Sequence, residues 1–417
     1  MTTFLTRGAL FPMLGLLPLA TASAEGFIDD SKLKLQLRNV YFNENFRDEH
    51  GMSARAARTA KSERTEWAQG FLLDYQSGFT PGTVGFGVDA LGLLGVKLDS
   101  GPGRSGTGLL PVHDDGRAAD EFASVGMTAK ARVAKTTVKY GTLLPKMPVL
   151  IYNDARLLPQ TYQGTQVSST DIDNLALTAG SLERFKLRDS SDSMPIVPDG
   201  YGGDESGDFN YAGADYKLGK NIRLSYFYGE LENFYRQNFA GIQHDVPLGA
   251  GVLTSDLRYF NSVDSGSAYG GKIDNDMLSG LLSYAVVGHT FSAGYQKLSG
   301  EAGLPYISGA TVYSFSNAGI GKFIEEDEKT WMLGYGYDFA RLGVPGLTFS
   351  SRYLSGNDGK SSTAVKEWER DAEIAYVVQQ GTFKGLGVKL RNYVYRSDFS
   401  RGRDSNRIYV SYDIALW

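Results

Sequence analysis

Basic side chains recur at every second position in several separate stretches of this chain. In residues 31–42, Lys32, Lys34 and Arg38 alternate with leucines. Other stretches place basic residues opposite apolar ones in the same way, namely Lys130 and Arg132, then Arg352, then Lys389 and Arg391, and finally Arg407. On a β-strand such alternation directs the basic side chains to one face. Guanidinium groups bind carboxylates through paired hydrogen bonds, so a row of them would offer an anion successive weak sites.

Each of these residues, taken singly, is better explained as a charge that solvates a polar face. Taken together they favour a path for anions, because walls of low dielectric constant would focus their field on one side of a lumen. The net charge of the whole chain is −5, which argues against nucleic acid as a partner.

The chain offers little for catalysis or for metal binding. Its four histidines, His50, His113, His244 and His289, lack the mutual spacing of metal ligands, and there is no cysteine. The glycines around Phe86 and Leu386 lack the strand–turn–helix context of a phosphate-binding loop, and no G-x-S-x-G motif is present. The sequence therefore predicts no cofactor, no metal site and no enzymatic activity.

The elements that must hold the basic residues are strands. In residues 407–417 the apolar side chains of Ile408, Val410, Tyr412, Ile414 and Leu416 alternate with more polar ones. In a membrane β-barrel the apolar face of such a strand meets lipid and the polar face meets the lumen. We expect this strand to pair with the first strand and so to remove the open edge of the sheet.

Residues 1–24 have the features of a secretory signal peptide. Arg7 precedes an apolar run over residues 9–20, and Ala22-Ser23-Ala24 provides a small-residue cleavage site. A buried N-terminal helix is the alternative, which Pro12 and Pro18 disfavour. Residues 25–417 then form the mature domain, in which no apolar run reaches the ~18 residues of a membrane helix.

Composition and pattern predict an all-β transmembrane antiparallel barrel of roughly 16–18 strands. The 51 glycines, 25 tyrosines and 22 phenylalanines suit a protein with many turns and aromatic girdles. Strands are expected at 31–42, 70–77, 83–99, 124–133, 136–140, 174–179, 209–218, 222–229, 252–260, 276–286, 289–297, 330–338, 347–354, 373–379, 386–395 and 407–417. Residues 44–66 and 100–121 are expected as loops. Residues 146–164, which contain Pro148 and Pro159, break the alternation and are expected to fold inward and narrow the channel.

Several blocks of the chain resemble the OprD family of outer-membrane carboxylate channels. The segment from Gly26 to Phe42 resembles the first strand of the family, and the segment from Trp67 to Ala90 resembles its next hairpin. Further similar blocks, in the same order, are Ala155 to Thr161, Glu230 to Gln237, His289 to Lys297 and Gly343 to Phe349.

The resemblance implies an 18-stranded barrel in the outer membrane of a Gram-negative bacterium, with inward loops that form a narrow eyelet. It also implies a ladder of basic residues that guides carboxylates. By position, Arg156 is an eyelet candidate, for which a salt bridge that anchors the loop is an equal alternative. Arg38, Lys389, Arg391 and Arg407 fall on the ladder, and Leu157 and Tyr306 fall at the eyelet.

One departure from the family concerns the substrate. The branch that takes basic amino acids tends to place an acid beside its eyelet tyrosine, whereas this chain has Pro305 before Tyr306, with Glu301 the nearest acid in the sequence. That favours the branch whose members take up aromatic carboxylates such as benzoate or vanillate. A basic-amino-acid channel is the alternative within the family.

Two other classes of protein remain as alternatives. An outer-membrane barrel enzyme, such as a protease or lipase, would need an Asp/His or Ser/His cluster at the rim, and a secreted β-sandwich lectin would not need detergent for extraction. For a porin we expect small carboxylates, outer-membrane lipid, lipopolysaccharide and the barrel-assembly machinery as partners, and a pore that works as a monomer or in a loose trimer.

Overall fold

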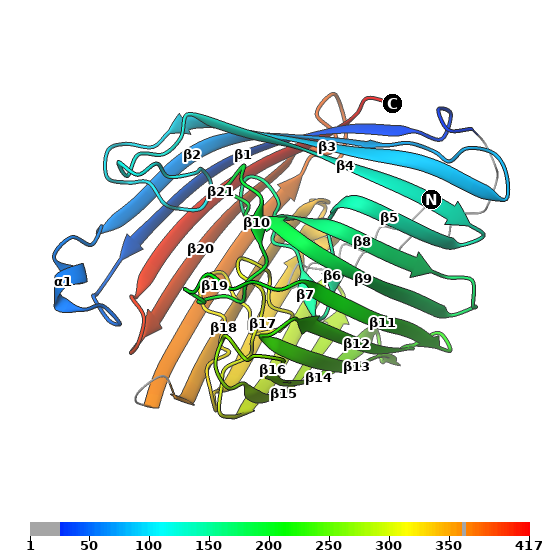
Figure 1. Cartoon of the computed structure of the whole chain (residues 1–417). Coiled ribbons are helices and arrows are strands. Elements are labelled where there is room, and N and C mark those ends of the chain that lie inside the picture. The colour runs from blue at the N-terminus through cyan, green and yellow to red at the C-terminus, as the bar shows by residue number, and fades with distance from the viewer. Residues whose placement is uncertain (1–25, 361–363) are drawn as a thin grey trace.

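The computed structural model describes residues 26–360 and 364–417, in which the strands form one closed antiparallel barrel of 18 strands (Figure 1). Each barrel strand pairs with the next along the chain. The barrel closes where β1 (Lys32–Phe46) pairs with β21 (Arg403–Ala415), with Leu37 opposite Tyr412. The expected fold class and the role of the last strand are therefore confirmed. Residues 1–24, the expected signal peptide, lie outside the described residues.

The remaining strands follow in chain order around the barrel. They are β2 (Glu63–Gln76), β3 (Val84–Asp99), β4 (Glu121–Val133), β5 (Thr136–Leu143), β8 (Thr161–Ser169), β9 (Leu175–Lys186), β11 (Phe209–Leu218), β12 (Ile222–Leu231), β13 (Tyr235–Leu248), β14 (Gly251–Asp264), β15 (Asp274–Val286), β16 (His289–Gly300), β17 (Lys329–Asp338), β18 (Leu347–Lys360), β19 (Ala364–Val377) and β20 (Gly387–Ser397). Three two-residue strands, β6 (Lys146–Met147), β7 (Leu150–Ile151) and β10 (Met194–Pro195), lie in the loops.

Side chains alternate between a lipid face and a lumen face along every barrel strand. The outer face is apolar and exposed, as at Val125 (72%), Leu333 (57%) and Leu390 (47%). Residues next to outward ones, such as Arg391 beside Leu390 and Arg352 beside Tyr353, point into the barrel, where they contact other lumen residues. The alternation in the sequence therefore assigned these side chains to the correct faces.

The two ends of the barrel differ in the length of their connections. At one end β15 and β16 are joined by Val287 and Gly288 alone, both with positive φ (48° and 83°), as a two-residue hairpin turn requires. The other end carries the long loops and the short helix α1 (Ala54–Ala57) (Figure 1). A 3-10 helix, η1 (Phe339–Leu342), lies at the short-turn end. No helix in the described residues is long and apolar enough to cross a membrane.

Two strands were missed by the sequence prediction. β13 (Tyr235–Leu248) contains His244, Asp245 and Pro247, which interrupt its apolar alternation, yet it pairs with β14 along its whole length and with β12 from Tyr235 to His244. β8 begins at Thr161, inside the segment that we expected to be irregular up to residue 164. The expected loop at 44–66 is also shorter, because β1 runs to Phe46 and β2 starts at Glu63. Pairing with two neighbours extends strands through polar residues.

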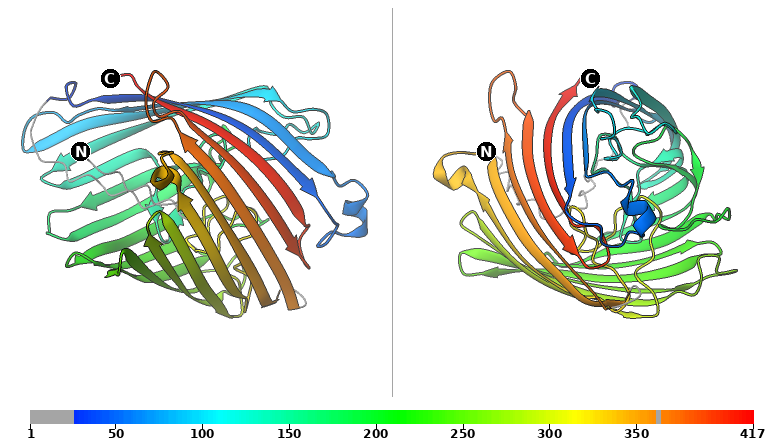
Figure 2. Two further views of the ribbon diagram at one scale, coloured as in Figure 1. Left: turned by 180° about the vertical axis from the view of Figure 1, so that it is seen from behind. Right: turned by 90° about the vertical axis from the view of Figure 1, so that its left-hand side faces the viewer.

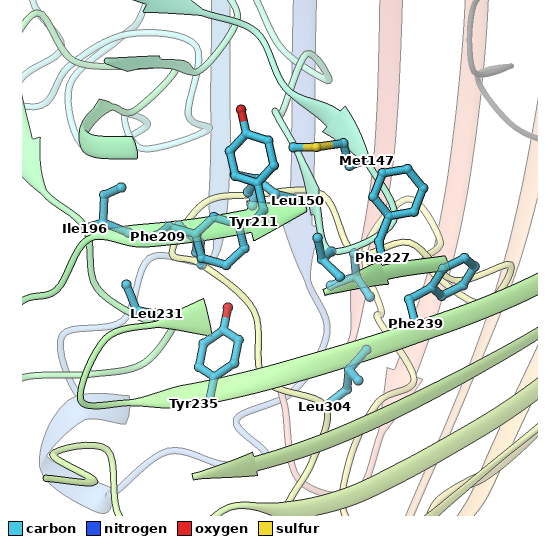
Figure 3. Packing of buried hydrophobic residues seen from close by; sticks show 14 of the residues in the cluster. Met147, Leu150, Ile196, Phe209, Tyr211, Phe227, Leu231, Tyr235, Phe239 and Leu304 are labelled. Carbon is cyan, nitrogen blue, oxygen red and sulfur yellow. The ribbon is translucent and has the colours of Figure 1, made fainter. Parts of the chain in front are cut away.

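A hydrophobic core lies inside the barrel (Figure 3). Met147 and Leu150 pack against Phe209 and Phe227 on the inner wall, and Leu304 joins them from another loop. Apolar residues on the lumen face of β11 to β13 thus bury the inward loops. The prediction that the segment after residue 146 folds into the lumen is confirmed.

The closing strand supports a test of assembly. The Leu33 amide donates to the Trp417 carbonyl (3.2 Å) and the Leu416 amide to the Leu33 carbonyl (2.9 Å). Deletion of Trp417 should reduce the amount of folded, heat-modifiable barrel in the outer membrane, because it removes a closing hydrogen bond and an interfacial aromatic anchor. Trp417→Phe keeps both and is the matched control. Normal folded yield after the deletion would contradict this role.

Candidate functional site

Three loops meet inside the barrel and restrict its lumen. They comprise residues 144–160, 187–208 and 301–328 (Figure 2). Gln160 donates to the Ser308 carbonyl (2.9 Å), and the Thr311 amide donates to the Ile151 carbonyl (2.9 Å). The Asp199 amide donates to the Tyr306 carbonyl (2.9 Å). Backbone and amide hydrogen bonds therefore hold the three loops together as one constriction.

The wall of β18 to β21 and β1 carries the predicted basic residues, but most of them are paired with acids. Arg38 forms a bidentate contact with Asp154 (2.5 and 2.9 Å), which lies in the loop 144–160. Arg352 donates to Asp371 (2.7 Å), and Arg391 pairs with Glu373. These three arginines lie in the lumen as expected, yet a neighbouring carboxylate already compensates each of them.

Arg156 and Arg407 are different, because no carboxylate lies within ion-pair distance of either among residues 26–360 and 364–417. Both guanidiniums lie over the ring of Phe42, at 4.7 Å and 4.3 Å from its centroid. Arg156 donates to the Thr107 carbonyl (3.1 Å), and Arg407 donates to the Gly319 carbonyl (3.2 Å). A phenylalanine on β1 thus holds together one guanidinium from a loop and one from the closing strand.

Arg188 in the loop 187–208 completes this group. A Cβ added at Gly108 would lie 3.5 Å from a terminal nitrogen of Arg188 and 3.8 Å from Nε of Arg156, so both guanidiniums flank this glycine. Burial and the like charges of Arg407 and Arg188 lower the pKa of Arg156 to about 9. Burial lowers the pKa of Arg188; the negative charge of Asp189 opposes this shift, and the positive charge of Arg407 adds to it. We call Arg156, Arg188 and Arg407 the arginine triad.

A second basic group lies nearer the long-loop end. Arg64, Arg401 and Arg403 surround the ring of Phe46 at 5.0, 3.8 and 5.8 Å. Phe42 and Phe46 are four residues apart on β1, so they share its lumen face. Each phenylalanine therefore carries a cluster of guanidiniums, and the two clusters follow one another along the lumen wall.

The predicted residues on β4 lie near the short-turn end. Lys130 contacts Asp89 and donates to the Ser77 carbonyl (2.7 Å), and Arg132 lies over the ring of Phe79 (4.2 Å). They are not near the arginine triad. Lys389 lies on the lumen face of β20, two residues from Arg391.

The sequence model of the OprD family, described as an outer membrane porin, matches residues 25–416. The chain belongs to the OprD family. Porin-like protein GalP of Pseudomonas putida is 40% identical to it over 97% of each chain. The family consists of outer-membrane channels, so this OprD-family porin is a channel for small solutes and not an enzyme.

Solved structures of porins from Pseudomonas aeruginosa are similar to this OprD-family porin. OccK9 (OpdG) has a TM-score of 0.90 and 41% identity, over 94% of this chain and 100% of that one. The structure of OpdK with vanillate has a TM-score of 0.88 and 41% identity, with the same coverage. The constriction described above therefore lies in a barrel of the family architecture.

One eyelet prediction for this porin differs from the structure. Leu157 is fully buried and packs on Gly70, so it anchors its loop and does not face an open passage. The acid nearest to Tyr306 is Asp199 of the loop 187–208, whereas Glu301 pairs with Lys272 (2.6 Å). Tyr306 does lie at the junction of the loops, and burial beside Asp199 raises its pKa.

The sequence reasoning also missed basic residues of this porin. Arg188 lies in an irregular loop, where alternation gives no signal. Arg64 precedes the stretch that we recognised as strand, although it lies inside β2. A usable signal was present in Phe42 and Phe46, because two aromatic residues on the polar face of a strand indicate partners for cations.

Proposed function

We propose that this porin admits small carboxylates by passive diffusion, with a preference for aromatic ones such as benzoate or vanillate. The observation that carries the proposal is the arginine triad, in which three guanidiniums converge and neither Arg156 nor Arg407 has a carboxylate within ion-pair distance in the described part of the chain. Each guanidinium has five N–H donors, and the hydrogen bonds of Arg156 and Arg407 leave some of these donors free. A bound carboxylate would relieve the mutual repulsion that lowers the pKa of Arg156.

The paired arginines extend this path along the lumen wall, with Arg391 on β20 opposite Arg407 and Arg38 four residues from Phe42 toward the short-turn end of β1. Their charges are partly compensated, so a carboxylate would bind Arg391 or Arg38 less strongly than the triad. Arg64, Arg401 and Arg403 would attract anions at the long-loop end. Passage requires weak binding, and a dissociation constant in the millimolar range corresponds to about 4 kcal/mol.

The preference for an aromatic substrate rests on the surfaces beside the triad. Tyr409 lies on the lumen face of β21, where its hydroxyl reaches the Ala155 carbonyl (3.3 Å) and its ring lies near Arg391 (5.3 Å). A benzoate carboxylate could contact the triad while its ring lies against this tyrosine. The similar porin OpdK has been solved with vanillate, an aromatic carboxylate.

The channel for basic amino acids is less well supported. A cationic substrate would need a free acid at the constriction, and Asp199 beside Tyr306 is the candidate. Lys322 lies 3.4 Å from this carboxylate and also contacts Tyr306. Its ammonium group compensates Asp199, so this carboxylate is not free to bind a cationic substrate.

Uptake into liposomes tests the choice of substrate. Liposomes that contain the porin should take up benzoate or vanillate faster than arginine, because arginine brings a guanidinium toward the triad. The measurement is the rate of radiolabelled solute uptake, with protein-free liposomes as the control. If arginine enters as fast as benzoate, the proposed preference for aromatic carboxylates is wrong. That result would not contradict the assignment of the protein as a channel.

A further inference from the structure

The outer surface of the barrel changes from apolar to polar side chains at one level along the strands. On β21 the outward residues from Leu416 to Ile408 are apolar or aromatic, and the next two outward residues are Asn406 and Asp404. With a rise of ~3.4 Å per residue and a strand tilt of ~40°, the apolar part spans roughly 21 Å along the membrane normal. An apolar band on such barrels is about 25 Å tall, so Asn406 lies close to its outer boundary.

A row of polar side chains marks this boundary on adjacent strands. Asn392 on β20 donates to Asn406 (2.8 Å), and Asn406 lies opposite Asn43 on β1. Asn43 in turn donates to Thr65 on β2 (2.9 Å). Long loops emerge on this side, which is the extracellular side in outer-membrane barrels. Asn406 and its hydrogen-bond partner Asn392 therefore lie near the level of the outer-leaflet headgroups.

Three aromatic residues stand on the outer surface just beyond this boundary. The rings of Trp331 and Tyr353 are 5.4 Å apart, and those of Tyr353 and Trp368 are stacked at 5.8 Å. Trp331 and Tyr353 are 39% and 38% exposed, so part of each side chain is accessible from outside the barrel. The Arg396 guanidinium lies 5.9 Å from the Trp368 ring.

Arg370 supplies an uncompensated charge beside these rings. It lies opposite Tyr353 across the β18–β19 pair, its side chain is exposed, and it donates to the Asn392 amide oxygen. Among residues 26–360 and 364–417 no carboxylate lies within ion-pair distance of it. Arg370 lies opposite Val394 on β20, which in turn lies opposite Asp404 on β21. Asp404 is therefore two strands away from Arg370, and it already pairs with Arg47 and Arg396 (2.7 Å).

We propose that Arg370, together with Trp368 and Tyr353, binds the phosphorylated sugar headgroup of an outer-leaflet glycolipid. A guanidinium binds phosphate through paired hydrogen bonds, and aromatic rings pack on the apolar faces of sugars. Ile374, Leu390 and Ile408 form a continuous apolar row on the membrane side of the polar row, where acyl chains would lie. A soluble phosphate would gain nothing from that apolar row.

Binding of diphosphorylated lipid A to the purified porin in detergent tests the proposal. Native mass spectrometry should detect a bound lipid A, and Arg370→Glu should weaken this binding at least tenfold, because the new carboxylate repels phosphate. Arg341→Glu is the matched control, since Arg341 is also exposed but lies in η1 at the short-turn end. Its lipid A binding should equal that of the unchanged porin.

Three further measurements separate the sources of phosphate and the alternatives. Dephosphorylated lipid A should bind more weakly than lipid A, and neither phosphatidylglycerol nor inorganic phosphate should compete with it. Equal lipid A binding by Arg370→Glu and Arg341→Glu would overturn the proposal, as would equally tight binding of phosphatidylglycerol. A change in oligomer size with unchanged lipid A binding would assign the surface to contacts between porin copies instead. The conductance of Arg370→Glu should be normal, which confirms that the barrel is folded.

Discussion

The double variant Arg156→Glu/Arg188→Glu should convert the pore, for which we propose an anion preference, into a cation-preferring one and reduce benzoate uptake at least tenfold. Each substitution changes the lumen charge by two units. The two side chains flank Gly108 at the constriction. The distance between their guanidiniums and a passing ion at this point is shorter than the Debye length of about 8 Å at physiological salt, so salt screens the charge change only in part. Loss of hydrogen bonds to charged groups costs ~1.5–3 kcal/mol each, and 1.4 kcal/mol is a tenfold change in binding.

Reversal potentials in a salt gradient measure this selectivity directly. Arg341→Glu provides the control for added negative charge outside the lumen and should leave the reversal potential unchanged. We chose the two loop arginines because Arg407 is almost fully buried and its reversal would also disturb packing around Phe42. If the double variant keeps the anion preference, the triad does not determine selectivity.

The fold was largely predictable from the sequence, because a barrel strand repeats one simple pattern. The alternation in residues 407–417 and 386–395 placed Arg407 and Arg391 in the lumen, and the structure confirms both. β13 was missed because the consecutive polar residues Gln243, His244 and Asp245 fall on both of its faces, and pairing with neighbouring strands holds it in the sheet.

The candidate site was predictable only in part. Alternation gives the face of a residue but not its partner across the lumen, so the pairing of Arg38 with Asp154 has no signal in the sequence. Arg188 belongs to an irregular loop whose path depends on the inner core. The burial of Leu157 likewise depends on the contact of its loop with Gly70, which precedes it by 87 positions.

Replacement of Glu369 by alanine should enlarge the pore and weaken its selectivity. Glu369 lies on the lumen face of β19 and is fully buried. Its carboxylate accepts hydrogen bonds from the amides of Ile320 (2.9 Å) and Gly321 (2.6 Å) in the loop 301–328. The adjacent Gly319 carbonyl accepts the Arg407 hydrogen bond, so the same turn connects the loop to the triad.

The alanine variant leaves the buried Gly321 amide and the partly buried Ile320 amide without an acceptor, and an unsatisfied buried group costs ~1–3 kcal/mol. If the tip of the loop 301–328 moves out of the lumen, water can accept these hydrogen bonds. The loop should therefore leave its position. The barrel should stay closed, because β19 remains paired with β18 and β20. Single-channel recordings should then show a higher conductance and more open-pore noise, and the ratio of benzoate to arginine uptake should fall. Glu369→Gln is the matched control, because its side chain has the same length and keeps one oxygen that accepts a hydrogen bond. Its conductance should lie between those of the alanine variant and the unchanged porin. Unchanged conductance and noise in the alanine variant would mean that the inner core alone holds the loop, since the apolar contacts of Phe315 and Phe323 with Leu354 would remain.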